Sequence, residues 1–259
     1  MCEMIFIDTR EGLSGDMLLA AMIGLLDDSA RRRTTDLLGL VSQRRDVTFH
    51  IEEMEEDHEK GLGISYTRPD APQREASYDE CFGRLGEMEK ELGSSSAVGK
   101  KILTNIFEAE AEAHRLPVRD VHLHEIGRTQ AMTNIAGIGF VSALLSRDGD
   151  EEFVCSTITT GRGVVVVSHG AIRIPAPASA FLLRGLKNEQ GSSPGERATP
   201  TGIAAVKTLV STQSDVVPDR FSRKSIGFGT KRFGGRLGRT TLYKARNDLT
   251  TKAQGISNE

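Results

Sequence analysis

Residues 4–26 read MIFIDTREGLSGDMLLAAMIGLL, and they predict a buried strand that leads through a glycine-bearing turn into a buried helix. The apolar run Met4 to Asp8 has the length of a short strand. The segment Asp16 to Leu26 is apolar on most sides, as expected of a helix that other elements enclose. This stretch opens an alternation of strands and helices along the chain, which is typical of α/β proteins.

The alternation is imperfect, so the sequence predicts an α/β or mixed α+β fold with a sheet flanked by helices. We expect two subdomains, residues 1–117 and 118–248, and a frayed polar tail at 249–259. The expected helices are 35–41, 78–92, 97–114, 130–145 and two that begin at Pro177 and Pro200; the expected strands are 47–53, 163–168 (buried on both faces) and 241–245; the expected loops are 61–76, 187–197 and a glycine-rich turn after residue 224.

Composition excludes several classes of function. The net charge of −3 gives no overall field that would attract nucleic acid or a membrane surface. The chain has no tryptophan and three tyrosines, which disfavours a stacking surface for single-stranded nucleic acid. Three cysteines with no close pair indicate a reducing compartment, and no apolar run approaches the ~20 residues of a membrane span. We therefore expect a cytoplasmic protein.

Two of the six histidines stand one residue apart in the segment VHLHEIG, residues 121–127. In extended backbone His122 and His124 project to the same side, while Glu125 turns away. Two imidazoles on one face are a plausible ligand pair for nickel or zinc. The alternative is a pair of polar residues at the end of a strand.

Three predicted helices begin directly after extended segments. They start at Asp16 behind Ser14 and Gly15, at Pro177, and at Pro200 behind Thr199. Helix starts present unpaired backbone N–H groups and the positive end of the helix dipole, which suit a phosphate. If the three starts converge, they form a pocket for a phosphorylated small molecule. The alternative is that Ser14 and Thr199 are ordinary helix caps.

Four short blocks in this order resemble the nickel-pincer-cofactor nickel insertase family. They are GLSGDM at 12–17, VHLHEIG at 121–127, HGAIRIPAPAS at 169–179 and ATPTG at 198–202. The family counterparts are an S-G-D-M start, an H-x-H-E-x-G block, an H-G-x-x-P-x-P-A-P-A-[TS] block and a T-P-T-G block. The resemblance spans residues 4–246.

The resemblance implies a ligand and a reaction. The family inserts nickel into pyridinium-3,5-bisthiocarboxylic acid mononucleotide, forms a nickel–carbon bond and consumes CTP with a divalent metal such as Mg²⁺ or Mn²⁺. It implies His122 and His124 as Ni(II) ligands with His169 as a third, although His169 could equally be a turn residue. Asp16 or Glu125 would be the hard ligand or the base. The expected ligand-binding residues are Ser14, Gly15, Thr199, Thr201 and Gly202.

The chain departs from the family pattern at two places. After the histidine block the family carries two aspartates four residues apart, and here these positions are Gln130 and Asn134. Neutral amides keep hydrogen-bonding capacity but weaken a cation site or a general base. The family's carboxy-terminal glycine block becomes the basic segment Gly227 to Phe233, followed by Arg236 and Arg239, which reads either as a phosphate-holding turn or as a solvated loop.

Full-length family members continue into a domain associated with nucleotide binding, and this sequence contains no Walker A pattern. One hypothesis is half of a split enzyme, a nickel chelatase of the lyase class that needs a partner chain for the CTP-dependent step. The other is a divergent, non-catalytic paralogue that serves as an assembly or scaffolding subunit. The loss of the aspartate pair favours the second hypothesis, since a split partner would not require changes in this half's own site. A metal-dependent hydrolase is disfavoured, because it would need clustered carboxylates.

Overall fold

The computed structural model describes residues 3–68, 75–123, 128–146, 151–167 and 170–246, and only the backbone of residues 165–167. Within these residues a seven-stranded mixed sheet has the order β11-β6-β1-β13-β12-β3-β2. β1 pairs antiparallel with β13 and parallel with β6, and β12 pairs parallel with β3. The strands are β1 Glu3–Asp8, β2 Thr48–Glu56, β3 Glu59–Thr67, β6 Glu152–Cys155, β11 Thr212–Gln213, β12 Arg223–Phe233 and β13 Arg236–Arg246.

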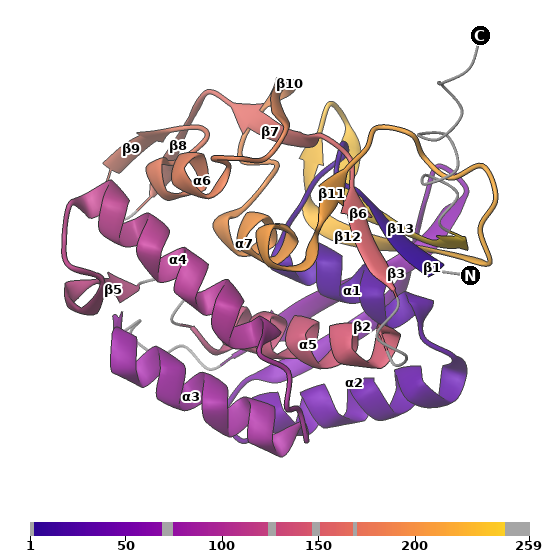
Figure 1. Cartoon of the computed structure of the whole chain (residues 1–259), viewed down its shortest axis with the longest axis horizontal. Coiled ribbons are helices and arrows are strands. Elements are labelled where there is room, and N and C mark those ends of the chain that lie inside the picture. Colours follow the sequence, from indigo (N-terminus) through magenta and orange to yellow (C-terminus); the bar gives the residue numbers. More distant parts are fainter. Residues whose placement is uncertain (1–2, 69–74, 124–127, 147–150, 168–169, 247–259) are drawn as a thin grey trace, which may run out of the picture.

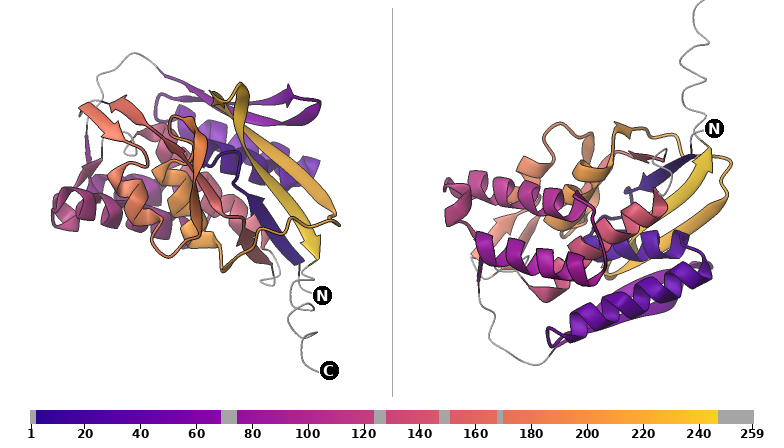
Figure 2. Two further views of the ribbon diagram at one scale, coloured as in Figure 1. Left: turned by 90° about the horizontal axis from the view of Figure 1, so that it is seen from above. Right: turned by 60° about the horizontal axis from the view of Figure 1, so that its bottom comes forward.

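The helices gather on one face of this sheet, as Figures 1 and 2 show. α1 lies against the sheet, and nine of its eleven residues are buried. α1 also packs against α5, so it forms the centre of the main core. The helices are α1 Gly15–Leu25, α2 Asp28–Gln43, α3 Tyr78–Glu91, α4 Val98–His114, α5 Thr129–Leu145, α6 Pro177–Leu182 and α7 Pro200–Leu209, with a 3-10 turn, η1, at Val118–Asp120.

Three two-stranded pairings lie outside the large sheet. β4 pairs antiparallel with β5, β7 pairs parallel with β10, and β8 pairs antiparallel with β9. These strands are β4 Ala76–Ser77, β5 His122–Leu123, β7 Ile158–Arg162, β8 Val164–Val167, β9 Gly170–Arg173 and β10 Asn188–Pro194. None of the helices in the described part of the chain is both long and apolar enough to cross a membrane.

The α/β fold class and the opening strand and helix are confirmed, and so are the helices expected at 78–92, 97–114 and 130–145. Both proline-initiated helices form, with Pro177 and Pro200 in the first turn. Two glycines of α5 serve close packing, as interior glycines suggest. A Cβ atom at Gly137 would lie 2.8 Å from Leu19 Cδ2, and one at Gly139 would lie 3.0 Å from the backbone nitrogen of Gly99.

The loop expected at 61–76 is wrong over its first half, because residues 59–67 form β3. β2 and β3 make a hairpin whose turn residues Asp57 and His58 both have positive φ angles, 52° and 64°, as a type I′ turn requires. The glycines that suggested a loop instead permit packing: a Cβ atom at Gly61 would lie 2.8 Å from Ile226 Cβ on the neighbouring strand.

Further expectations need correction. The polar loop expected at 187–197 contains β10, which pairs with β7. The strand expected at 163–168 is not buried on both faces, since Val164 in the β8–β9 hairpin is 60% exposed. The segment Gly227 to Phe233 lies within β12, and the turn that follows is Gly234–Gly235. The helix expected at 35–41 begins earlier, at Asp28, capped by the Asp27 side chain.

The large sheet takes strands from both sides of residue 118. β1, β2 and β3 precede that residue, and β6, β11, β12 and β13 follow it. In the sheet, β13 and β12 stand between β1 and β3. A division near residue 118 is therefore not a division of the sheet, and the two subdomains stay a prediction.

Candidate functional site

Two of the three predicted helix starts lie side by side. An isolated parallel bridge joins Leu13, before α1, to Ala198, before α7. The Leu13 N–H donates to the carbonyl of Arg197 (3.0 Å), and the Thr199 N–H donates to the carbonyl of Leu13 (2.9 Å). Glycine is needed at position 202, because a Cβ atom there would lie 2.8 Å from the Leu13 carbonyl oxygen. The first turns of α1 and α7 are thus held together by the backbone.

Both predicted caps form. Ser14 Oγ accepts from the Met17 N–H (3.4 Å) and donates to Asp16 Oδ1 (2.6 Å). Thr199 Oγ1 accepts from the Gly202 N–H (3.4 Å). The capping interpretation of Ser14 and Thr199 is confirmed, and their role toward a ligand stays a prediction.

α5 brings an amide to the same place. A Cβ atom at Gly15 would lie 2.8 Å from Thr201 Cγ2 and 3.3 Å from Asn134 Cβ, so α1 touches both α7 and α5 here. Asn134 is 8% exposed, and its Oδ1 accepts from the hydroxyl of Tyr66 on β3 at 2.6 Å. Gln130, half-buried, precedes Asn134 by one turn of α5. We call these six residues the helix-start cluster: Ser14, Gly15, Asp16, Tyr66, Asn134 and Thr201.

Asp16 is the only charged side chain of the helix-start cluster. It is half-buried in the first turn of α1, where the helix dipole favours a carboxylate. Burial, together with the nearby Asp16 charge, raises the pKa of Tyr66 well above its ordinary value. Tyr66 is therefore a neutral phenol, and its hydroxyl donates a hydrogen bond to Asn134 Oδ1. The cluster combines one negative charge with a fixed neutral amide.

Tyr66 was missed by the sequence analysis, because it lies in the segment expected to be a loop. A signal was present in the segment Ile64 to Tyr66, in which buried Ile64, exposed Ser65 and half-buried Tyr66 alternate. Isoleucine and tyrosine are also enriched in strands. The two glycines just before this segment outweighed that signal.

The predicted nickel ligands are described only in part. His122 lies in β5 opposite Ser77, is exposed, and places Nδ1 3.1 Å from the carbonyl oxygen of Asp120. His124, Glu125 and His169 lie outside the described residues. Among the residues that are described, no group of three or more His, Cys, Asp or Glu side chains could hold a metal ion. The predicted ligand set is therefore untested.

The third predicted helix start is placed by other contacts. The chain enters α6 through Ile174, whose N–H donates to the carbonyl of Gly163 (2.9 Å), and α6 packs against α4.

The carboxylate of Asp8, at the end of β1, accepts two hydrogen bonds from the guanidinium of Arg10. Arg10 Nε lies 2.9 Å from Oδ1, and a terminal nitrogen lies 2.6 Å from Oδ2.

The basic segment Gly227 to Phe233 is part of a strand and not a loop, and its phosphate-holding role stays a prediction. Arg232 and the arginines that follow it bind carboxylates at or next to the β2–β3 turn and in the turn before α1. Arg232 binds Glu56 (2.6 Å) and Arg236 binds Asp57 (3.1 Å). Arg239 binds both Glu11 and Glu59. These ion pairs tie the β2–β3 hairpin to the β12–β13 hairpin.

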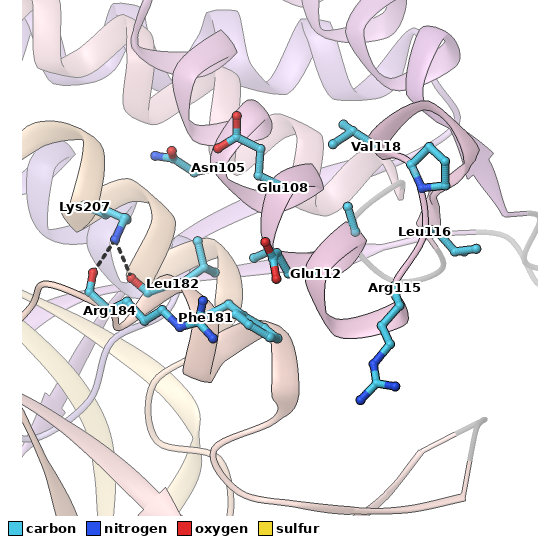
Figure 3. Close-up of a pocket in the computed structure, with 13 residues that line it drawn as sticks. Asn105, Glu108, Glu112, Arg115, Leu116, Val118, Phe181, Leu182, Arg184 and Lys207 are labelled. Atoms are coloured by element: carbon cyan, nitrogen blue, oxygen red, sulfur yellow. Dashed lines mark hydrogen bonds between the residues drawn. The ribbon is translucent and has the colours of Figure 1, made fainter.

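A cavity of about 670 Å³ lies between α4 and the α6–α7 pair, and Figure 3 shows its lining. The guanidinium of Arg184 stacks on the ring of Phe181, 4.1 Å from the ring centroid. Lys207 Nζ donates to the carbonyls of Leu182 (3.0 Å) and Arg184 (2.6 Å) near the end of α6. The cavity shares no lining residue with the helix-start cluster, so the two are separate features.

Comparison with known proteins identifies nickel insertion proteins among the relatives of this chain. The profile of the family described as nickel insertion protein matches residues 5–254. A nickel insertion protein of Geotalea daltonii is 30% identical over 239 residues, which are 89% of this chain and 58% of that protein. The pyridinium-3,5-bisthiocarboxylic acid mononucleotide nickel insertion protein of Staphylococcus epidermidis is 29% identical over 245 residues, 90% of this chain and 57% of that protein. The chain thus spans less than three-fifths of these relatives' length. No solved structure matches it.

Proposed function

The chain belongs to the nickel insertion protein family, and on that premise we propose that it acts in the cytoplasm in nickel-cofactor biosynthesis. Its ligand would be the pyridinium-3,5-bisthiocarboxylic acid mononucleotide named in a relative, with Ni(II) as the metal substrate. One observation supports the proposal most directly: two of the four sequence blocks shared with the family lie next to each other in the fold. The Ser14–Asp16 start of α1 and the Thr199–Gly202 start of α7 are joined at Leu13.

The chemistry divides between two sets of residues. First-turn N–H groups of α1 and α7 suit an anionic ligand, and Asp16 is a carboxylate beside them that can act as a base toward a ring carbon. His122, His124 and His169 supply borderline ligands suited to Ni(II), and Glu125 a second carboxylate. We propose that CTP, with Mg²⁺ or Mn²⁺, is used together with a partner chain.

Calorimetric titration of Ni(II) into the metal-free protein tests the nickel role. We expect micromolar or tighter binding that is lost when His122→Ala and His124→Ala are combined, because two of the proposed ligands are removed. His114→Ala is the matched control. His114 is an exposed histidine at the end of α4, paired with Glu110, and we assign it no role. Unchanged nickel binding in the double variant would remove the ligand assignment.

A second candidate, a non-catalytic assembly subunit, is favoured by one observation. Asn134, which stands where the family carries an aspartate, is an amide and cannot act as a base, and its Oδ1 accepts a hydrogen bond from Tyr66. This candidate predicts weak nickel binding and stable co-purification with a larger complex. Recovery of the native protein only as a single chain that binds nickel tightly would exclude it.

A further inference from the structure

β2 is an open edge of the large sheet. The strand order ends at β2, so among the described residues only its β3 side is paired. Figure 2 shows the β2–β3 hairpin at the margin of the molecule. The strand at the opposite edge, β11, has only two residues, whereas β2 has nine. An edge strand of this length offers a row of backbone donors and acceptors to another chain.

The turn of the hairpin determines which backbone groups of β2 are free. Two residues, Asp57 and His58, connect the strands, so Glu56 and Glu59 form the hydrogen-bonded pair that closes the hairpin. Hydrogen-bonded and non-hydrogen-bonded pairs alternate along an antiparallel ladder. The residues whose N–H and C=O groups point away from β3, here called the outward residues, are therefore Phe49, Ile51, Glu53 and Glu55.

The side chains of β2 protect this edge only by their charge. Edge strands are commonly protected by a short length, a bulge, a proline or a lysine. β2 has none of these, and its register with β3 is continuous over all nine residues. Glu52, Glu53 and Glu55 are exposed and have no ion-pair partner among the residues that the structure describes. Glu56, by contrast, is bound by Arg232.

The acidic charge of the edge selects its occupant. A second copy of β2 would bring the same glutamates to the ladder, and like charges on paired strands are unfavourable. A strand with lysine or arginine beside them is held by backbone hydrogen bonds and by opposite charges. We propose that β2 binds a basic, extended segment of a partner protein, which adds to the seven-stranded sheet next to β2. This surface is independent of the nickel role, which concerns other residues.

Two terminally blocked peptides of the same length as β2 test the proposal with the intact chain. In one peptide lysine alternates with threonine and valine, and in the other glutamate replaces every lysine. We expect the lysine peptide to bind about tenfold more tightly, because opposite-charge pairs replace like-charge pairs. Fluorescence anisotropy of the labelled peptides measures both affinities. Equal affinities, or no binding of the lysine peptide, would overturn the proposal.

Amide hydrogen exchange distinguishes strand addition from a loose electrostatic contact. The N–H groups of the outward residues bond to no described residue, so they should exchange rapidly in the free protein. The lysine peptide should slow exchange at all four outward residues. His50, Glu52 and Met54 should change little, because their N–H groups already bond to β3. Binding without this alternation would contradict strand addition.

Charge reversal assigns the peptide preference to β2. Glu53→Lys combined with Glu55→Lys should make the chain prefer the glutamate peptide. Glu108→Lys combined with Glu112→Lys is the matched control, because these are two exposed glutamates on α4 that form no ion pair with a described residue. The control should keep the wild-type preference. A reversed control, or an unchanged β2 variant, would show that the peptide binds elsewhere.

A proline substitution tests the backbone of β2 directly. Glu53→Pro removes one outward donor but no bond to β3, which an edge strand tolerates. It should abolish the slowed exchange, whereas Glu53→Gln, which removes only the charge, should keep the alternating pattern at weaker affinity. Slowed exchange that persists in Glu53→Pro would exclude strand addition. If Glu53→Pro does not fold, the charge-reversal variants still decide.

Sedimentation of the chain without peptide tests the other occupant of the edge. We expect no self-association through β2, because the glutamates of two copies repel each other. A dimer that Glu53→Lys with Glu55→Lys alters, and that the α4 control leaves intact, would show that a second copy occupies β2. That result would overturn the assignment of a basic segment.

Discussion

Gly15 illustrates how a single residue sets the geometry of the helix-start cluster. It lies where α1 contacts both α5 and α7, next to Thr201 and Asn134. A methyl group at this position would press on both, and these two side chains belong to different helices. The residue that sequence analysis assigned to ligand binding therefore also has a packing role. Substitution at Gly15 is expected to affect stability as well as any ligand.

Gly15→Ala should lower the free energy of unfolding by about 1–3 kcal/mol, the range for forcing an extra methyl group into a packed site. The added Cβ would lie 2.8 Å from Thr201 Cγ2. Gly86→Ala, inside α3, is the control, because its Cβ would meet nothing within 4 Å. The control should gain up to about 1 kcal/mol from helix propensity. Urea unfolding measures both, and equal effects would contradict the packing argument.

The β2–β3 hairpin is the element that carries Tyr66 to the cluster, and its attachment to the rest of the sheet is slight. Only Leu62 and Gly63 pair with β12. Ion pairs supplement this short ladder: Glu59 binds Lys224 on β12 and Arg239 on β13. Networks of this kind contribute more than isolated surface pairs. We therefore expect the hairpin's attachment to depend on pH.

Glu59→Gln should lower stability at pH 7 by about 1 kcal/mol or less, as for a partly exposed network. Hydrogen bonding from Lys224, then the charge of Arg239, lowers the pKa of Glu59 below its ordinary 4.5. A lowered pKa contributes stability above pH 4.5 that is lost as pH falls through the folded-state value. The difference between wild type and variant should thus shrink in acid. Glu55→Gln, exposed on β2, is the control, and a pH-independent difference would contradict the assignment.

The sequence pattern predicted the elements that are buried because they are themselves apolar. It missed the elements whose secondary structure depends on contacts with neighbouring strands. The opening strand and α1 are apolar over most of their length, so their composition and length sufficed. β3 contains Gly61 and Gly63, whose missing side chains make room for Ile226 and for Met54 across the hairpin. That reason becomes visible only when the neighbouring strands are in place. Tyr66, and with it the orientation of Asn134, was missed for the same cause.

At the scale of the whole molecule, the order of the strands in the large sheet differs from their order along the chain. β1 pairs with β6 and β13, both of which come from after residue 118. Pro117, which follows α4, suggested a subdomain boundary in the sequence. Strands on the two sides of that boundary pair with one another, and such long-range pairing leaves no periodic signal in the sequence. The helix-start cluster has the same character, since its residues come from α1, β3, α5 and α7. Neither half of the chain contains the whole cluster.

Residues 1–117 alone should therefore not unfold cooperatively. This fragment keeps α1 to α4 and the β2–β3 hairpin, but β1 lacks both of its partners, and the strands that separate β1 from β3 are absent. The apolar faces of β1 and α1 would then be exposed to water, at a cost of roughly 25 cal/mol per Å². Far-UV circular dichroism should show helix, while urea should give a broad transition instead of the sharp one expected of the intact chain. A sharp transition from this fragment would instead establish it as an independent subdomain, and residues 118–248 can be tested in the same way.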